Sequence, residues 1–486
     1  MGSESIGKKT VLGIGWRMME RILAQLVTFV VSLVLARLLS PGDYGAVAII
    51  TVFITIANVF ITDGFSAALI QKKNTDALDY TSVTIGGFVL SVFLYLICFF
   101  CAPWIAEFYD MPILSPTLRV LALRLPIASI NSVQVAYVSK KMQFKKFFWA
   151  TFGGTMASAV VGIYMALNGY GVWALVAQSL SNYTIDTIVL ALSIRRFPKL
   201  RFSMTRLKGL LSFGYKILLT NLLFVFIDQL RTLVIGKRYS SEDLAYYSKG
   251  KSFPQMLSTN ISGPISNVLF PALSTMQDSV ADVRHFMRRS IRTISFLVPA
   301  LLLGFAAVSK NFVLLVLTEK WLPCVPFIFL GAVYYLLPPI HSTNLEAVKA
   351  VGKSDQVLKY GMIKRGVSVA ALLATLWFGA LGIMLGLIAS AVIATCINAY
   401  QNKKLFEYSY KEQLFDILPN MIPAAMMCGC VCLIGMLCKA MHPALALLVQ
   451  VPSGVVLFVF FSVLLQNRTF KELWGNVKGK ILRKKA

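Results

Sequence analysis

Charged residues are scarce in this chain of 486 residues. They make up 14% of it, against roughly a quarter in an average soluble domain, whereas hydrophobic residues make up 57% and the mean hydropathy is +0.71. A chain of this composition cannot cover a water-facing surface with polar groups. The scarcity therefore excludes a soluble enzyme, a secreted disulfide scaffold and a disordered protein, and it indicates a polytopic membrane protein.

Acidic residues and histidine are scarce as well. Asp and Glu number 21 against 47 Lys and Arg, which gives a formal net charge of +26, and there are 3 His. Three histidines are too few for a histidine-based metal cage or a long proton relay. The basic residues lie in short segments between apolar runs without interleaved aromatic residues, so membrane topology and anionic lipid explain them better than nucleic acid does. The sequence predicts no metal, no other cofactor and no nucleic-acid partner.

The cysteines give no sign of a disulfide framework. Nearly all of the 8 fall inside apolar segments. Cys428, Cys430 and Cys432 have no accompanying His or carboxylate, and packing of small residues explains them better than a metal site. Cys98 and Cys101 have the spacing of a redox motif but lack its βαβ context.

Apolar runs long enough to cross a bilayer, about 20 residues each, recur along the whole chain, and about fourteen of them can be placed. They lie at residues 14–38, 46–70, 82–106, 117–138, 148–168, 172–194, 212–236, 253–275, 292–316, 324–346, 357–378, 380–400, 416–438 and 444–466. Residues 1–10 are short and polar, unlike a signal peptide. The sequence predicts an all-α polytopic membrane protein without a soluble domain.

Lys and Arg predict the orientation of these spans. With the N-terminus inside, the inner segments hold about 30 Lys and Arg and the outer segments about 8, which is a strong positive-inside signal. Tryptophan falls near span ends, as in an aromatic belt, at Trp16, Trp104, Trp149, Trp173, Trp321 and Trp377. Both termini are predicted to be cytoplasmic.

An internal repeat relates two parts of the chain. Residues 32–45 read SLVLARLLSPGDYG and residues 232–245 read TLVIGKRYSSEDLA, with identical Leu, Val, Ser and Asp at the constant offset of 200. A chance match is the alternative. Halves of six helices each insert in the same direction, as in parallel-repeat transporters. The predicted organisation is an N-terminal lobe at 1–200, a C-terminal lobe at 201–402, and two additional helices with a basic cytoplasmic tail at 403–486.

Charged side chains also occur inside the first span, where each costs about 2.5–3.5 kcal/mol of insertion and usually serves a function. Arg17, Arg21 and Gln25 repeat at intervals of four, and Glu20 follows Arg17 by three, so the four form one polar stripe. The stripe either lines a water-filled cleft or is a cluster that snorkels to the inner interface.

The fourth and seventh spans carry similar groups. Arg124 and Asn131 lie two turns apart at one angle of the fourth span, either in a cleft or in an intramembrane ion pair, and Pro126 is placed to bend that helix. In the seventh span, Asp228 and Arg231 either face the cleft or neutralise each other.

Cationic groups outnumber anionic groups within the spans, which suits an anionic cargo because Arg makes bidentate contacts with phosphate. The candidate substrate-binding residues are Arg17, Arg21, Arg124, Gln25, Asn131, Asn221 and Arg231. The candidates for ion coupling or charge pairing are Glu20, Asp63, Asp186 and Asp228. For Asp63 and Asp186, helix capping or local pairing is the alternative.

Four short motifs, in this order and spacing, carry a family resemblance. They are Ser40-Pro41-Gly42-Asp43-Tyr44-Gly45, Asp63-Gly64-Phe65-Ser66-Ala67-Ala68-Leu69-Ile70-Gln71-Lys72, Phe270-Pro271-Ala272-Leu273-Ser274 and Glu319-Lys320-Trp321-Leu322-Pro323. Over essentially its whole length the chain resembles the bacterial polysaccharide exporters, which are lipid-linked oligosaccharide flippases of the MATE-like MOP superfamily, and is nearest the colanic-acid and teichuronic-acid type. Ala245 departs from the Gly expected in the second turn motif.

The resemblance implies a MATE-like fold of about fourteen transmembrane helices, in two pseudo-symmetric six-helix lobes plus two C-terminal helices, around a central cavity. It implies a transporter of the bacterial cytoplasmic (inner) membrane, not an enzyme. The implied cargo is an undecaprenyl-pyrophosphate-linked glycan that is flipped by alternating access. Membrane lipid and other polysaccharide assembly proteins are the further partners it implies.

Two other functions remain open. An ion-coupled multidrug-type antiporter of the same superfamily would need an acidic, aromatic cavity. A membrane polysaccharide polymerase or transferase would need a sizeable outer loop with catalytic residues, and the largest predicted one, 237–251, holds only Glu242 and Asp243. Gly352-Lys353-Ser354 lacks the upstream Gly of a phosphate-binding loop, so an ion gradient is expected to drive transport rather than ATP.

Overall fold

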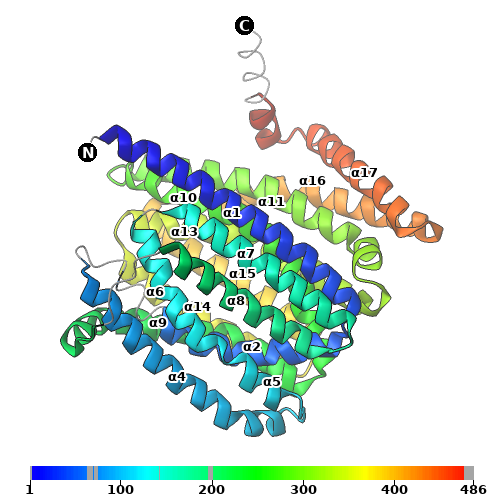
Figure 1. Cartoon of the computed structure of the whole chain (residues 1–486). Coiled ribbons are helices and arrows are strands. Elements are labelled where there is room, and N and C mark those ends of the chain that lie inside the picture. Colours follow the sequence, from blue (N-terminus) through cyan, green and yellow to red (C-terminus); the bar gives the residue numbers. More distant parts are fainter. Residues whose placement is uncertain (1–2, 63–68, 70–74, 142, 195–200, 476–486) are drawn as a thin grey trace. The chain divides into compact units, whose positions relative to one another are not determined.

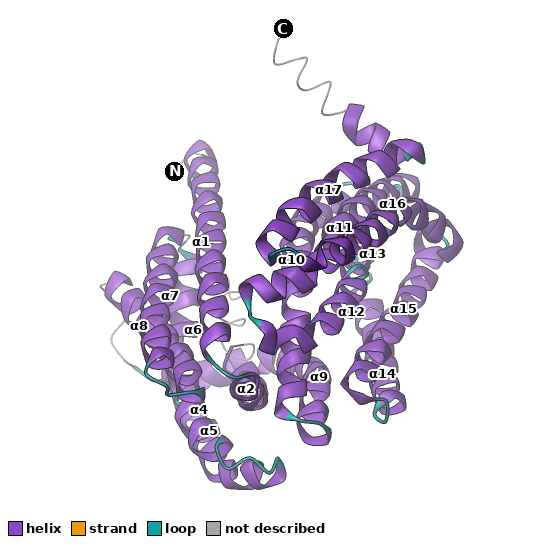
Figure 2. Ribbon diagram, turned by 90° about the vertical axis from the view of Figure 1, so that its right-hand side faces the viewer, coloured by secondary structure: helices purple, strands orange, loops and turns teal. Residues whose placement is uncertain are grey.

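The structure is a computed structural model of the chain that describes residues 3–62, 69, 75–141, 143–194 and 201–475. None of these residues forms a strand, and Figure 2 shows helices joined by short turns. The predicted all-α class is confirmed. Packing divides the chain into two compact units, Met1–Ala245 and Tyr246–Ala486.

The first unit is a bundle of eight helices among its described residues, shown from blue to green in Figure 1. They are α1 (Ser3–Leu38), α2 (Pro41–Ile61), α4 (Ala77–Phe108), α5 (Leu114–Leu121), α6 (Arg124–Lys140), α7 (Phe144–Leu167), α8 (Val172–Ile194) and α9 (Met204–Arg238). Helix α7 packs between α1 and α8, and α8 also contacts α6. Helix α9 packs mainly on α2 and α4, which places it in this unit. The division into lobes at 1–200, 201–402 and 403–486 rests on the repeat and stays a prediction.

The second unit contains the remaining helices. They are α10 (Ser241–Ser274), which begins at the end of the first unit, α11 (Val280–Val316), the 3-10 helix η2 (Glu319–Cys324), α12 (Val325–Tyr335), α13 (Pro338–Ala350), α14 (Ser354–Thr375), α15 (Gly379–Phe406), α16 (Tyr410–Leu437), the 3-10 helix η3 (Cys438–Ala440) and α17 (Pro443–Leu464). Within it, α11 packs on α12, α13, α16 and α17, and α15 packs on α12, α13 and α14.

Ten helical segments of the described chain are long and apolar enough to cross a membrane. They are α2, α4, α5 with α6, α7, α9, α11, η2 with α12 and α13, α15, α16 and α17. Helices α1, α8, α10 and α14 are of comparable length but more polar. If the broken helices are each counted as one segment, the described residues hold fourteen segments, which agrees with the expected architecture.

Two spans are broken at corresponding positions in the two halves. The fourth segment of the first half breaks between α5 and α6, and Pro126 lies in the first turn of α6. The fourth segment of the second half breaks between α12 and α13, where Pro338 and Pro339 begin α13. Proline is tolerated in a first helical turn because its missing N–H has no partner there. Matched interruptions of this kind are the feature of inverted or parallel repeats that best marks a binding site.

The turns of the repeat are identical at the level of hydrogen bonds. Before α2, the Asp43 N–H donates to Ser40 Oγ (3.2 Å) and the Ser40 N–H donates to Asp43 Oδ2 (3.0 Å). Before α10, Asp243 and Ser240 make the same two bonds at 2.9 and 3.3 Å. Such a reciprocal cap satisfies two backbone donors at a helix start. The cap explains why Ser and Asp are retained at an offset of 200, and it forms although Ala245 replaces the expected Gly.

The two turns also touch each other, through Gly45. A Cβ atom added at Gly45 would lie 1.9 Å from the backbone oxygen of Ser241 and 2.9 Å from its Cα atom. Only glycine allows α2 to approach the first turn of α10 so closely.

We expect Gly45→Ala to lower the stability of the protein, because the new methyl group meets rigid backbone. Overpacking of this kind costs about 1–3 kcal/mol. The thermal midpoint of the purified protein measures the effect. Gly42→Ala is the matched control, since its Cβ would meet nothing closer than 3.7 Å. Equal midpoints for the two variants would contradict the contact.

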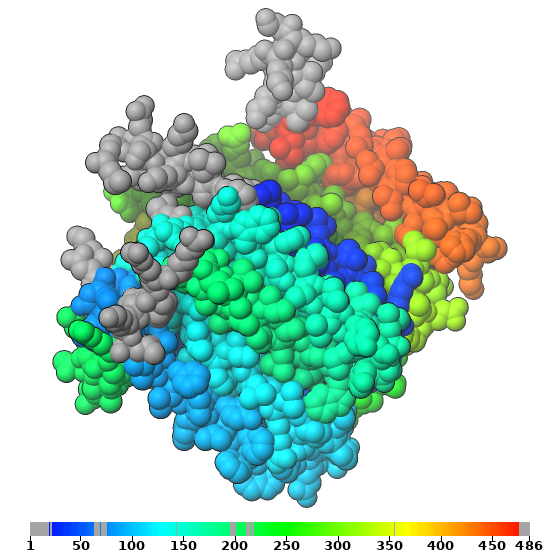
Figure 3. Space-filling view, viewed as in Figure 1, coloured from blue at the N-terminus to red at the C-terminus, as the bar shows by residue number. Residues whose placement is uncertain are grey.

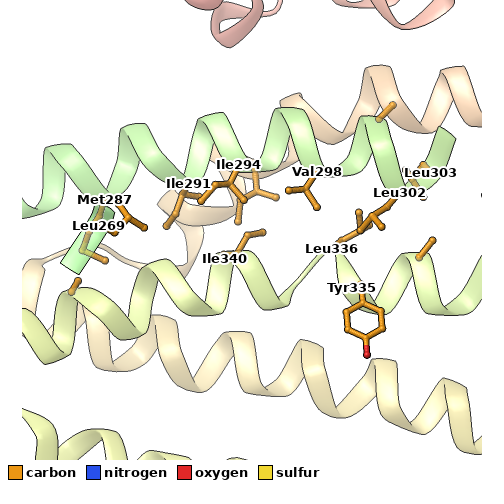
Figure 4. Close-up of a cluster of buried hydrophobic side chains, with 14 of the residues drawn as sticks. Leu269, Met287, Ile291, Ile294, Val298, Leu302, Leu303, Tyr335, Leu336 and Ile340 are labelled. Carbon is orange, nitrogen blue, oxygen red and sulfur yellow. The ribbon is translucent and has the colours of Figure 1, made fainter. Parts of the chain in front are cut away.

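The core of the second unit follows one face of α11. Its buried residues recur every three or four positions, as a helix face requires, and are at most 3% exposed: Val283, Met287, Ile291, Ile294, Val298 and Leu302. Figure 4 shows Ile291, Ile294 and Val298 near Ile340 and Leu336. Because lipid tails are as apolar as these side chains, close packing holds such helices together rather than exclusion from water.

Two sequence predictions about loops are wrong. The expected outer loop at 237–251 is helical from Ser241 onward. The arginines at 284–292, which fall mostly between the predicted spans 253–275 and 292–316, lie in α11 rather than in a loop, and their inner side stays a prediction. In both places a serine cap starts the helix ahead of the apolar run: Ser240 accepts from the Asp243 N–H and Ser279 from the Asp282 N–H. Hydropathy detects only the apolar part of such a helix.

Candidate functional site

A polar face lies where α6 packs on α8 in the first unit. The break after α5 makes Arg124 the first residue of α6, in the middle of a span. Its guanidinium carbon stacks 3.7 Å from the centre of the Tyr183 ring, and one of its N–H groups donates to the Tyr183 hydroxyl. A desolvated cation–π contact of this type contributes about 2 kcal/mol.

Asn131 and Asp186 continue this face. The Asn131 amide nitrogen donates to Asp186 Oδ2 at 2.8 Å. Asn131 follows Arg124 by seven residues on α6, and Asp186 follows Tyr183 by three on α8, so both pairs belong to one contact between the helices. The structure thus brings together three residues that the sequence singled out, and adds Tyr183, which the sequence reasoning missed.

A polar cavity of about 280 Å³ adjoins Tyr183. It is lined by residues of α1, α7 and α8: Thr28, Val31, Thr155, Ser158, Gln178, Ser179, Asn182 and Tyr183. The Asn182 amide donates to Ser158 Oγ at 3.3 Å across it. Figure 3 shows the side chains of α4 to α8, from blue through cyan to green, closely packed on the face of the first unit that is in view. Hydroxyl and amide groups of this kind suit a ligand rich in hydroxyl groups.

Glycines of α7 set the width of this site. A Cβ atom at Gly154 would lie 2.8 Å from the backbone oxygen of Asn182, and one at Gly162 would lie 3.0 Å from the Gln178 side chain. The close approach of α7 to α8 therefore depends on small residues, as is common between membrane helices.

Three buried polar atoms of α6 have no hydrogen-bond partner among the residues that the structure describes. They are Arg124 Nε, Ser129 Oγ and Gln134 Oε1. Buried polar atoms are nearly always paired in proteins, and within a membrane span each unpaired group is costly. These atoms therefore retain bonding capacity for water or a ligand, and the Arg124 N–H is the one best suited to an anion.

The other predicted site residues are placed as follows. Gln25 is half-buried on α1, three residues before the cavity residue Thr28. Arg17, Glu20 and Arg21 lie on the α1 backbone, but their side chains, like the whole of Asp63, lie outside the described residues.

Three further candidates are on α9, whose main partners are α2 and α4. Asn221 is half-buried, Asp228 is exposed and Arg231 is buried. None of the three lines the cavity beside Tyr183. A single site that combines all seven substrate-binding candidates stays a prediction.

The second unit contains a polar cluster at the corresponding position. His341, in the first turn of α13, lies with its Nε2 2.6 Å from Thr395 Oγ1 of α15, and the Lys364 ammonium of α14 donates to Asn398 Oδ1 of α15 at 2.9 Å. The pair α13–α15 joins the fourth and sixth segments of its half, as α6–α8 does. The sequence reasoning overlooked His341. The signal for it was Pro338-Pro339, which marks a helix break directly before His341.

The fold and these clusters define a class: a polytopic membrane transporter built from two halves, each with a broken fourth helix and polar residues against its sixth. Residues 34–326 match the family described as "Polysaccharide biosynthesis protein", and the chain belongs to this family. The family resemblance predicted from the motifs is confirmed.

Relatives of the chain cover most of its length. It is 23% identical to the lipopolysaccharide biosynthesis protein WzxC of Escherichia coli, over 85% of each chain. It is 22% identical to the succinoglycan biosynthesis transport protein ExoT of Rhizobium meliloti, over 81% of this chain and 78% of that one. It is 23% identical to the teichuronic acid biosynthesis protein TuaB of Bacillus subtilis, over 99% of each.

Solved structures show the same fold. The lipid II flippase MurJ, in an inward closed conformation, superposes with a TM-score of 0.72 over 92% of this chain and 99% of that one, at 14% identity. A multidrug resistance MATE transporter of the MOP superfamily, facing inward, superposes with a TM-score of 0.62 over 79% and 96%, also at 14% identity. The predicted MATE-like fold is confirmed.

Proposed function

We propose that this protein is a flippase that moves undecaprenyl-pyrophosphate-linked oligosaccharide units across the bacterial cytoplasmic membrane for cell-surface polysaccharide export. The observation that carries the proposal is Arg124, whose buried Nε–H has no hydrogen-bond partner among the described residues and whose guanidinium stacks on Tyr183, a lining residue of a cavity with hydroxyl and amide groups. The printed names of the relatives, which include polysaccharide biosynthesis and transport proteins, support it.

The chemistry of such a cargo matches these groups. A charged pyrophosphate and a sugar chain cannot enter hydrocarbon unaided, because each unpaired polar group costs several kcal/mol there. A guanidinium binds phosphate oxygens in a bidentate manner, and hydroxyl and amide side chains exchange hydrogen bonds with sugars. The polyprenyl tail stays in the lipid. Two halves that rock about the bound head group then carry it from one leaflet to the other.

The coupling ion would act through the carboxylates. Asp186, held by Asn131, is a carboxylate on the same α6–α8 face as Arg124, so a change in its charge would alter the field at the arginine. Glu20, Asp63 and Asp228 remain candidates for coupling or charge pairing.

Deletion of the protein tests the function. We expect cells without it to lose the surface glycan and to accumulate the lipid-linked oligosaccharide on the cytoplasmic face, and the intact chain to restore export. Chemical labelling of the glycan in inverted and right-side-out vesicles measures the sidedness. An unchanged surface glycan together with increased sensitivity to cationic drugs would contradict the flippase and favour the multidrug-type antiporter.

The orientation is a further part of the proposal. Reporter fusions at Lys199 and Ala486 are expected to report the cytoplasm, and a fusion at Gly169, between α7 and α8, the opposite side. The reason is the excess of Lys and Arg in the segments assigned to the inside. A signal on the outer side at Lys199 or Ala486 would mean that the number of spans before it is wrong by an odd number.

A further inference from the structure

Three arginines on α11 face two carboxylates on α16. Arg284 pairs with Glu412 at 2.5 Å. Arg288 and Arg292 both pair with Asp416, whose side chain is 3% exposed, through Nε at 2.5 and 2.7 Å. The spacing of four residues on both helices aligns the two rows over two turns.

Three further hydrogen bonds hold these arginine–carboxylate pairs in place. The Tyr408 hydroxyl donates to Asp416 at 2.9 Å, and burial, together with the nearby Asp416 carboxylate, raises the pKa of Tyr408, so that it stays a donor. Asn420 donates to the Arg292 carbonyl at 3.2 Å. Asn467 donates to Asn420 Oδ1 at 3.0 Å, which ties the helical residues 468–475 to α16. The guanidinium groups of Arg284, Arg288 and Arg292 are therefore held in place without a ligand.

An open cationic pocket of about 350 Å³ lies beside this network. Its lining consists of His285, Arg288, Arg289, Arg292, Arg468 and Glu472. The four positive charges of the lining arginines are opposed by two negative charges, those of the lining residue Glu472 and of the buried Asp416. Arg289 has no ion pair with any described residue, and the pairing of Arg468 with Glu472 (3.0 Å) is mostly exposed. The pocket therefore carries excess positive charge.

Its surroundings place the pocket at the level of lipid head groups. The apolar face of α11 continues directly from the pocket, and the membrane-length helix α17 ends at Leu464, just before the helix that bears Arg468. On that helix Trp474 is 62% exposed and stacks on Phe470, which contacts Phe296 of α11. Exposed tryptophan next to basic residues is typical of the membrane–water interface.

We propose that this pocket binds the phosphate group of an anionic membrane lipid. Arginine forks match phosphate oxygens, and basic pockets between membrane helices are known receptors for anionic head groups. The site shares no residue with the cavity beside Tyr183, so it is a lipid-binding site additional to transport of the cargo.

The test measures retention of phosphatidylglycerol by the purified full-length protein, by native mass spectrometry after exchange into mixed phosphatidylcholine and phosphatidylglycerol. Arg289→Gln with Arg468→Gln leaves Asp416 and its partners intact. We expect this double variant to lose at least about tenfold in affinity for phosphatidylglycerol, because each basic residue near an anionic lipid strengthens its binding. The matched control is Lys403→Gln with Lys404→Gln, which removes the same charge from exposed positions of the same unit outside the pocket.

Equal retention by the double variant and the control would overturn the proposal. Millimolar inorganic phosphate is added in a parallel arm. If inorganic phosphate does not displace phosphatidylglycerol, the pocket recognises phosphate as part of the lipid, as proposed. If it displaces the lipid and binds wild type but not the double variant, the pocket is a site for soluble phosphate and the lipid assignment is wrong.

Discussion

Export of the glycan is expected to fail when Arg124 is replaced by alanine, while the amount of protein in the membrane stays near normal. The guanidinium stacks on Tyr183, which lines the polar cavity, and its buried Nε–H has no partner within the described part of the chain. Removing it takes the proposed phosphate-binding group from the site without leaving a buried charge behind. Complementation of a deletion strain, with immunoblots for protein level, measures the effect.

Arg124→Lys is expected to restore part of the export, because the charge survives but the bidentate fork does not. Arg119 supplies a matched control in the same unit: its Nε donates to the Phe99 carbonyl at 3.2 Å and it lies over the Phe99 ring, away from the cavity lining. Arg119→Lys should export like wild type. Normal export by Arg124→Ala at normal abundance would mean that Arg124 does not bind the cargo. Alanine substitutions at Arg17 and Arg21 would then test the other predicted arginines.

Asp416→Ala is expected to cause the largest loss of stability. The substitution leaves Arg288 and Arg292 without their shared carboxylate and Tyr408 without its acceptor. Removing one partner of a buried ion pair costs about 3–5 kcal/mol, and the lower end applies here because both guanidinium groups are partly exposed. Thermal unfolding of the purified protein, followed by intrinsic fluorescence, measures the loss.

Glu472→Gln is the control for Asp416. It also breaks a carboxylate–arginine pair of the same pocket, but an exposed one, and should cost less than about 1 kcal/mol. If the two variants unfold at similar temperatures, Asp416 does not hold the helices α11 and α16 together.

Much of the fold could be predicted because its determinants are local. Apolar runs gave the spans, and the repeat of Ser and Asp around residues 40 and 240 corresponds to two identical helix caps. Pro126 correctly indicated a disturbance of its helix, which the structure shows as a break that places Arg124 at a helix start. Helix starts were placed too late where polar turns precede the apolar run.

Contacts between distant helices were beyond such reasoning. Asp416 and Arg288 are 128 residues apart, and nothing in either helix alone fixes which residues of the other it meets. Tyr183 was missed because a tyrosine in an apolar helix resembles any other packing residue. What the sequence did offer was the common spacing of four on both α11 and α16, which identifies matching faces once the helices are known to be neighbours.

The paired turns before α2 and α10 have a consequence for movement. Each cap satisfies its own backbone donors. The described contact between the turns is the close steric fit of Gly45 against the backbone of Ser241. Drawing the turns apart would uncover surface without breaking either cap. The contact between the turns fits in one register only, because the missing side chain of Gly45 makes room for the backbone of Ser241, and a separation of the turns would leave both caps in place.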